Sequence, residues 1–352
     1  MPKTHGGLWK HVTSWDNLYL AYTLAAKRKR YREAVLAFRA NLEENLFNIQ
    51  NRLLWNTWQP GAYREFVVFE PKRRLIMAPP FADRVVHHAL VNVIEPLFEN
   101  KMIDHSYACR TGRGSHRAAL QVQQYLRQAQ AMWGGKVYAL KADISKYFPS
   151  VRVDALMGMF ARTIRESSLL RVLDLIFNHG ARCGVGIPVG ALTSQLGANV
   201  YMTPVDHFLK DDLGVKMYVR YVDDWIVIHN SRQYLLDCLA RTEDRLTRLG
   251  LKLNGKTDIQ PASHGVDFCG YRIWATHLLP RKRNVQRAKR RFRALARKNP
   301  LGAINFEAIR PVVASFVGYI KHCNGYETAG SALACLALGG KRDDLYTEAP
   351  GC

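Results

Sequence analysis

The stretch that decides the fold is Met217-Tyr218-Val219-Arg220-Tyr221-Val222-Asp223-Asp224-Trp225-Ile226-Val227-Ile228. Apolar residues flank two adjacent aspartates on both sides, and this pattern predicts a strand-turn-strand over residues 216–228. Asp223 and Asp224 lie at the predicted turn. Asp is a common turn former, so an isolated pair has an ordinary structural explanation. A pair between two core strands, however, also places two carboxylates at one fixed point.

A second apolar run, over residues 136–142, ends at Asp143. If this predicted strand neighbours the hairpin in one sheet, three carboxylates meet at the same edge. Mg²⁺ prefers carboxylates together with substrate phosphates. Two such ions about 3.5 to 4 Å apart promote in-line displacement at phosphorus. The pattern therefore indicates phosphoryl transfer.

The composition favours a nucleic-acid partner. With 48% hydrophobic residues, the 352-residue chain has enough apolar material for buried cores, which excludes a disordered or collagen-like protein. Its 51 Lys and Arg residues against 29 Asp and Glu give a net charge of +22. A surplus of this size favours a polyanionic partner.

Cysteine usage and hydropathy bear on the cellular setting. The seven cysteines form no C-x-x-C pair, which argues against a disulfide framework or a zinc site and indicates reduced thiols. No run approaches the roughly 18 to 20 apolar residues of a spanning helix. The N-terminal MPKTHGGLWK lacks a signal-peptide core. We therefore expect a cytoplasmic protein with no membrane contact.

Three consecutive parts are expected along the chain. Residues 1–60 carry apolar positions at helical spacing and end at a Pro-Gly pair. Residues 61–279 mix strands and helices, and a last strand is predicted over residues 268–274. Residues 280–352 begin with a proline and are expected to be helical.

Two segments are strongly basic. Residues 63–79 predict a hairpin whose tip is Lys72-Arg73-Arg74. Residues 281–299 contain many Arg and Lys and no acidic residue, with apolar positions at helical spacing. A solvated helix usually mixes charge signs, so this segment predicts a helix that follows a phosphate backbone.

The motifs resemble one known family. Tyr221-Val222-Asp223-Asp224 is similar to the Y-x-D-D box of reverse transcriptases, and residues 143–148 resemble the partner metal motif of that box. The interval of 80 residues between Asp143 and Asp223 also suits the family. Further segments resemble the family in the same order: Tyr63 to Pro79, Asp83-Arg84, Gly112 to Ser115, Pro188 to Gly190 with Ser194-Gln195, Gly250 to Asn254 with Lys256, and Phe268 to Tyr271, which is similar to the primer grip.

The resemblance implies an α+β fold, a right-hand polymerase with an antiparallel palm sheet, a fingers hairpin and a helical thumb. The three parts then become an N-terminal helical segment (1–60), a fingers and palm polymerase domain (61–279) and a basic helical thumb (280–352). The implied activity is RNA-directed DNA polymerisation.

Two segments resemble a subfamily, the reverse transcriptases of diversity-generating retroelements. Residues 189–195, Val-Gly-Ala-Leu-Thr-Ser-Gln, are similar to its aliphatic-Gly-x-x-x-Ser-Gln signature, where retroviral, intron and retron enzymes typically carry Gln in place of Val189. Residues 315–324 resemble its thumb motif. Val222 departs from the group, whose box most often has Met there. This subfamily makes error-prone, adenine-mutagenic cDNA from a template-repeat RNA.

The family's metal-binding roles carry over onto matching positions. Asp143 and Asp223 are expected to bind two Mg²⁺ or Mn²⁺ ions, the carbonyl of Ile144 to complete one ligand set, and Asp224 to act electrostatically or from outside the ligand set. The nucleophile is the 3′-hydroxyl of a primer, so no nucleophilic side chain is required.

The nucleotide-binding roles have ordinary alternatives. Lys72 and Arg74 would clamp the triphosphate, although a solvated charged turn has the same composition. Phe148 matches the steric gate against a 2′-hydroxyl, although core aromatics are common after strands. Val189 and Gln195 would lie beside the nascent base pair, and Val189 would loosen the checking of that pair by about 1 to 2 kcal/mol; the alternative for Val189 is loop packing.

Lys256 would donate a proton to pyrophosphate, although it is nearly as well explained as a surface lysine.

The implied partners are a template RNA, the RNA/cDNA duplex, dNTPs and a small basic helical accessory protein, in a bacterial or phage-encoded setting. Two other functions fit the same sequence. One is an antiphage or retron-like reverse transcriptase, and the other is a noncatalytic RNA-binding scaffold.

Overall fold

A computed structural model describes residues 4–69, 73–297 and 306–337. The described chain divides into two interleaved compact units. The first comprises residues up to 113 together with 142–225 and 236–257, and the second comprises 114–141, 226–235 and residues from 258 onward. No helix in the described ranges is long and apolar enough to cross a bilayer.

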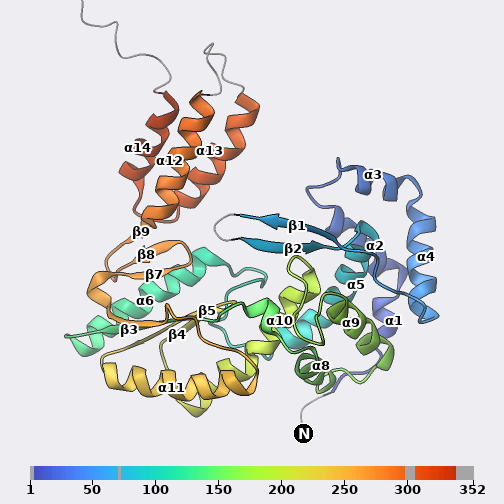
Figure 1. Ribbon diagram of the computed structural model, residues 1–352, viewed down its shortest axis with the longest axis horizontal. Helices are drawn as coiled ribbons and strands as arrows, with labels where there is room; N and C mark the ends of the chain where they lie inside the picture. The colour runs from blue at the N-terminus through green and yellow to red at the C-terminus, as the bar shows by residue number, and fades with distance from the viewer. Residues whose placement is uncertain (1–3, 70–72, 298–305, 338–352) are drawn as a thin grey trace, which may run out of the picture. The chain divides into compact units, whose positions relative to one another are not determined.

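The first unit is largely helical (Figure 1). Its core includes the packing of α2 on α5, where Leu18, Ala21, Val86 and Leu90 are fully buried. Ser14 caps the N-terminus of helix α2, since its hydroxyl accepts a hydrogen bond from the Asn17 amide at 3.4 Å. Its helices are α1 (Trp9–Val12), α2 (Trp15–Ala26), α3 (Glu33–Ala40), α4 (Leu42–Leu54), α5 (Phe81–Glu99), α7 (Tyr147–Ser150), α8 (Val153–Ala161), α9 (Ser167–His179), α10 (Leu192–His207) and the π-helical turn η1 (Phe208–Asp212), with α11 (Arg232–Arg248) following later in the chain.

The predicted hairpin over residues 63–79 is present. Strands β1 (Arg64–Val68) and β2 (Arg74–Ala78) pair antiparallel, from Arg64 opposite Ala78 to Val68 opposite Arg74. Most of its side chains are exposed. Arg74 opens β2, whereas Lys72 lies outside the described residues.

A four-stranded sheet contains the two predicted acidic strands. Its order is β4-β5-β3-β6, with bounds Tyr218–Tyr221 for β4, Asp224–His229 for β5, Tyr138–Asp143 for β3 and Asp258–Pro261 for β6. Strands β3 and β6 pair antiparallel. The side chains of β4 and β5 are mostly buried, which explains their nearly continuous apolar sequence.

The strand predicted over residues 268–274 is instead a hairpin. Strand β7 (Val266–Phe268) pairs antiparallel with β8 (Tyr271–Ile273), which pairs with β9 (Leu278–Pro280). The break falls at Cys269 and Gly270, whose φ angles are 48° and 91°. Positive φ at two successive residues ends a strand, and a glycine adopts it without strain. The short 3₁₀ turn η2 (Ala262–His264) precedes β7.

The second unit contains α6 (Ser115–Trp133) and three helices that lie side by side in Figure 1: α12 (Lys282–Arg297), α13 (Phe306–Ile320) and α14 (Tyr326–Ala337). These three helices enclose a hydrophobic core of their own. Phe292 of α12 is fully buried and meets Phe316 of α13 edge to face at 5.4 Å between ring centroids. The basic segment predicted as a helix is therefore helical and buries one apolar stripe.

These elements confirm the expected fold class, an α+β right-hand polymerase with antiparallel strand pairing in the palm, a fingers hairpin and a helical thumb. The boundaries at residues 60 and 280 stay predictions.

We predict that Phe292→Ala lowers the free energy of unfolding by about 3 to 5 kcal/mol, because it leaves a cavity between three helices. Chemical denaturation followed by circular dichroism measures the loss. Val317→Ala, on the exposed side of α13, is the matched control and should cost about 0.5 kcal/mol or less. Equal losses in the two variants would contradict a separate core in this bundle.

Candidate active site

The acidic turn is a tight connection between β4 and β5, and only Val222 and Asp223 separate the two strands. Val222 has φ 57°. Two-residue hairpin turns require positive φ at their first central position, which Gly or Asn usually supplies. A β-branched residue is strained there. The turn that presents Asp223 and Asp224 is thus held in a conformation that its own sequence does not favour.

Asp143 lies beside this turn, as expected from the sequence. It is the last residue of β3, which neighbours β5 in the sheet. The amide of the next residue, Ile144, donates a hydrogen bond to the carbonyl of Asp223 at 3.2 Å. The structure therefore brings Asp143, Ile144, Asp223 and Asp224 to one place. Their metal-binding roles remain predictions.

Asn254 holds the Asp143 carboxylate. Its side-chain amide donates to Oδ2 of Asp143 at 3.0 Å, and its backbone amide donates to the Asp143 carbonyl at 2.7 Å. The side-chain oxygen of Asn254 accepts from the amide of Lys256 at 3.2 Å. This orienting role was missed from the sequence. The available signal was the position of Asn254 at the end of Gly250 to Asn254, a motif already matched to the family.

A buried ion pair lies directly behind the turn. Arg220 and Asp206 are both fully buried and joined by two hydrogen bonds, Nε to Oδ1 at 2.7 Å and Nη2 to Oδ2 at 2.6 Å. Burial lowers the pKa of the guanidinium, but the charge and hydrogen bonds of Asp206, together with Tyr218 and Tyr147, outweigh burial and raise this pKa above its ordinary value. Arg220 therefore stays charged in the core. Sequence reasoning missed this pair as well.

The loop that contains Val189 is fixed from two sides. The Val189 carbonyl accepts from the Met77 amide of β2 at 2.9 Å, and the Ile187 amide donates to the Phe148 carbonyl at 3.0 Å. At Gly190, with φ 116°, an added Cβ would lie 3.1 Å from the side chain of Ile76. Only glycine allows this close approach. The structure thus places Phe148 and Val189 in one backbone-linked region with the fingers hairpin.

The other predicted nucleotide-binding residues lie on separate elements. Gln195 is half-buried in the first turn of α10, and Lys256 is exposed in the loop before β6. Arg74 is exposed at the start of β2. Two residues before Gln195, the hydroxyl of Thr193 contacts His87 Nδ1 at 2.8 Å. Burial lowers the pKa of His87 to about 3, so this buried histidine is neutral near pH 7.

The donor set of the acidic site consists of hard oxygens. Among the described residues, no group of three or more His, Cys, Asp or Glu side chains is arranged to hold a metal by itself. Mg²⁺ in proteins is commonly bound by one or two carboxylates and completed by substrate phosphates and water. The residues present therefore fit Mg²⁺ that binds together with a nucleotide.

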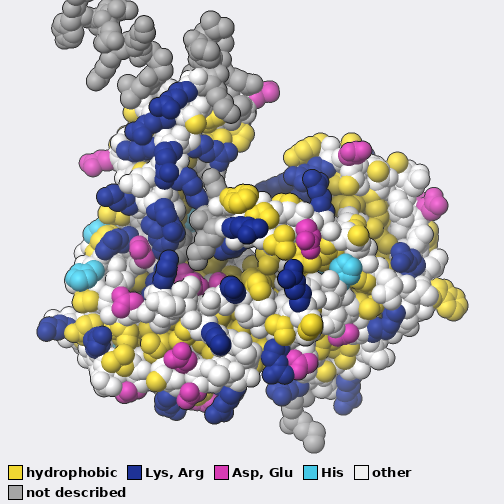
Figure 2. All heavy atoms as spheres, in the orientation of Figure 1, with side chains coloured by type: hydrophobic (Ala, Val, Ile, Leu, Met, Phe, Trp, Pro, Cys, Tyr) yellow, Lys and Arg dark blue, Asp and Glu magenta, His cyan; other side chains and the backbone are white. Residues whose placement is uncertain are grey.

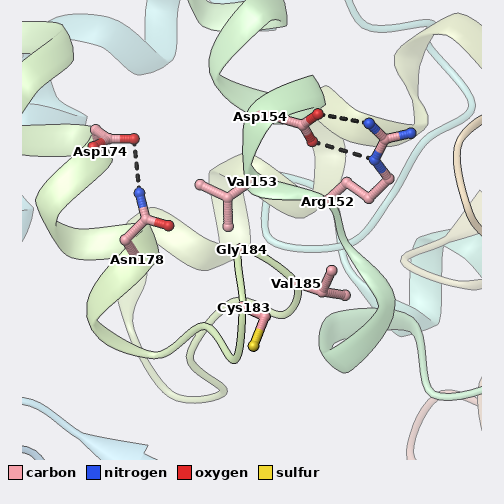
Figure 3. A pocket seen from close by; sticks show the side chains of 8 residues that line it. All are labelled: Arg152, Val153, Asp154, Asp174, Asn178, Cys183, Gly184 and Val185. Carbon is pink, nitrogen blue, oxygen red and sulfur yellow. Dashed lines mark hydrogen bonds and ion pairs between the residues drawn. The ribbon is translucent and has the colours of Figure 1, made fainter.

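A pocket of about 440 Å³ lies elsewhere in the first unit (Figure 3). Its wall contains none of the four acidic-site residues. Arg152 is paired with Asp154 at 2.6 Å, and the Asn178 side chain donates to Asp174 at 2.8 Å. These polar side chains already bond to one another in the pocket wall. The acidic turn is therefore the stronger candidate for the active site.

Comparison with known proteins identifies the family of this chain. Residues 70–273, more than half of the chain, match the reverse transcriptase (RNA-dependent DNA polymerase) family. Protein YkfC of Escherichia coli is 25% identical over 280 residues, which cover 66% of this chain and 72% of YkfC. The group II intron-encoded protein LtrA of Lactococcus lactis is 23% identical over 252 residues, which cover 67% of this chain and 41% of LtrA.

Among solved structures, apo telomerase from Candida tropicalis superimposes with a TM-score of 0.49 at 12% identity, covering 67% of this chain and 59% of that chain. The chain thus spans less than two thirds of LtrA and of the telomerase chain. The family match includes the whole acidic turn, the end of β3 and the Val189 loop. The chain therefore belongs to the reverse transcriptase family, the RNA-dependent DNA polymerases.

Proposed function

We propose that this protein copies RNA into DNA with the carboxylates of Asp143 and Asp223 as the metal-binding groups of its active site. The observation that carries this proposal is the hydrogen bond from the Ile144 amide to the Asp223 carbonyl, because it unites two acidic segments that are distant in sequence. Asp143, Asp223 and the Ile144 carbonyl would hold two Mg²⁺ or Mn²⁺ ions, with Asp224 acting from outside the ligand set. When bound, these ions supply charge neutralisation for the attacking and leaving oxygens.

The protein's own groups position the reactants. Asn254 fixes the orientation of the Asp143 carboxylate. Phe148 would exclude a 2′-hydroxyl, Gln195 and Val189 would lie against the nascent pair, and Arg74 with Lys72 would hold the triphosphate. Lys256, exposed and linked to Asn254, would protonate the departing pyrophosphate. The nucleophile is the primer 3′-hydroxyl, so the enzyme works by placement and by charge.

The exposed face of α12 is the proposed contact for the RNA/cDNA duplex. Figure 2 shows Lys and Arg side chains gathered over the three-helix bundle. Arg283, Arg287 and Arg290 are exposed on this helix at spacings that share one face. Such contacts recognise charge and shape rather than sequence.

For the template we propose the repeat RNA of a diversity-generating retroelement, copied with adenine-directed errors in the cytoplasm of a bacterial cell with a small basic helical accessory protein. The aliphatic Val189 with Ser194-Gln195, and residues 315–324, support this choice. Val189 removes a hydrogen-bonding side chain from the proposed checking position, which relaxes discrimination between base pairs.

A second candidate is reverse transcription of an intron-type RNA. The similarity to LtrA, whose name describes a group II intron-encoded protein, favours it. The proposed chemistry is the same in both cases, so the template and the error spectrum distinguish them.

We predict that Asp223→Asn lowers primer extension on an RNA template by about 10³-fold or more, since it removes a proposed metal ligand. Steady-state extension with dNTPs and Mg²⁺ measures the loss, and thermal melting checks the fold. Asp174→Asn, an exposed aspartate of the same unit, should retain full activity. Full activity of Asp223→Asn would remove the basis of the proposal.

Val189→Gln is predicted to reduce misincorporation opposite template adenine by about 5- to 30-fold, the factor that corresponds to 1 to 2 kcal/mol. Sequencing of cDNA made on the copurifying RNA measures it. Val185→Gln, at an exposed position four residues earlier, is the control and should leave the spectrum unchanged. An unaltered adenine bias in Val189→Gln contradicts the assigned role.

Replacing Arg283, Arg287 and Arg290 by Gln is predicted to weaken binding of an RNA/DNA duplex and to lower its salt dependence, by about 0.7 to 0.9 in slope for each lost phosphate contact. Fluorescence anisotropy at several salt concentrations measures both. The triple variant Arg241→Gln, Arg245→Gln, Arg248→Gln on α11 carries the same charge change and serves as control. Equal effects would show that only net charge matters.

A further inference from the structure

We infer that Arg220 is a positioning residue that holds the acidic turn in its active conformation. Resting on the proposed function, this inference assigns a role to a buried cation that touches neither substrate nor metal. The role is to fix the backbone of Val222, so that Asp223 and Asp224 project from a defined turn.

All three nitrogen atoms of the Arg220 guanidinium donate hydrogen bonds. Two of its donors engage Asp206, as described above, and Nη1 donates both to the Val222 carbonyl at 2.9 Å and to Asn199 Oδ1 at 3.2 Å. A planar guanidinium can serve these four acceptor atoms at once, whereas a lysine ammonium is a single point charge. The contact with Val222 thus depends on arginine specifically.

The surroundings of Arg220 are rigid. Its own amide donates to the His105 carbonyl at 2.9 Å, and its carbonyl accepts from the Tyr107 amide at 3.0 Å. Asp206 also accepts from the hydroxyl of Tyr218 at 2.7 Å. The side chains of Arg220, Tyr218 and Asp206 are fully buried. Because the backbone of Arg220 and its partner Asp206 are both held in place, the guanidinium keeps the Val222 carbonyl at a defined position.

Stability alone does not explain this pair. A buried ion pair is often no more stabilising than apolar side chains of the same volume, because two charges lose their hydration. Apolar side chains cannot donate a hydrogen bond to the Val222 carbonyl. With φ 57° at a β-branched residue, this turn needs an external restraint, and the guanidinium supplies one.

The same arrangement links the turn to the proposed nucleotide side of the site. Asn199 and Asp206, which hold Arg220, belong to α10, and Gln195 lies in the first turn of that helix. One continuous helix thus carries both the anchor of the acidic turn and a residue expected to contact the nascent pair. Rigid elements of this kind define the separation of functional groups better than loops do.

The test compares Arg220→Lys with Tyr218→Phe in the full chain. Tyr218→Phe removes one hydrogen bond to Asp206 from the same buried network but leaves the Val222 contact intact. Four measurements are made for each: kcat and dNTP KM in primer extension, Mn²⁺ binding by electron paramagnetic resonance in the presence of a dNTP, amide hydrogen exchange over residues 217–228, and melting temperature.

For Arg220→Lys we expect kcat to fall about 100-fold with little change in KM. We also expect Mn²⁺ binding to weaken about 10-fold or more and the turn to exchange faster. Tyr218→Phe should melt at a lower temperature and yet keep the kcat, Mn²⁺ binding and turn exchange of the wild type. Val222→Gly, which relieves the positive-φ strain, should recover part of the kcat lost in Arg220→Lys.

A folded Arg220→Lys with wild-type kcat, Mn²⁺ binding and turn exchange overturns the inference. So does a Tyr218→Phe variant with the same losses, since these would then follow stability alone. Should Arg220→Lys not fold, Asp206→Asn, which keeps the guanidinium but weakens its anchor, is expected to show the same losses in smaller degree; wild-type values there overturn the inference. If the wild type itself lacks RNA-templated activity, the proposed function fails, while turn exchange still tests the role of Arg220.

Discussion

The arrangement of this protein's acidic site depends on one backbone contact, the hydrogen bond between the Ile144 amide and the Asp223 carbonyl. The bond joins the end of β3 to a two-residue turn that lies 80 residues later in the chain. Carboxylates repel one another, so they do not gather without such a framework. The adjacency of β3 and β5 supplies this framework.

Around this contact, each acidic segment is held by a different polar group. Asn254 holds Asp143 from the loop before β6, and Arg220 holds the turn from within β4. The two restraints differ in kind. Asn254 is neutral and acts on a side chain, whereas Arg220 is charged, buried, and acts on a backbone carbonyl.

The sequence predicted the acidic hairpin and the strand ending in Asp143, because apolar alternation and turn chemistry are local properties. It did not predict the Arg220 and Asp206 pair, since nothing in the spacing of a strand residue and a helix residue shows that they face each other in a core. The turn at Cys269 and Gly270 was missed for a related reason. Its flanks, Phe268 and Tyr271, look like one continuous strand, and the positive φ of a cysteine has no sequence signature.

The order of strands in the sheet has a consequence for the synthesis of the protein. Strand β3 pairs with β6, which leaves the ribosome about 120 residues later, or about 6 to 24 s at 5 to 20 residues per second. Throughout that interval the nascent chain carries a β3 edge without its final neighbour, and unpaired edges are templates for association between chains. Growth temperature and codon choice between these two strands should therefore govern how much of the newly made protein reaches its native state instead of inclusion bodies.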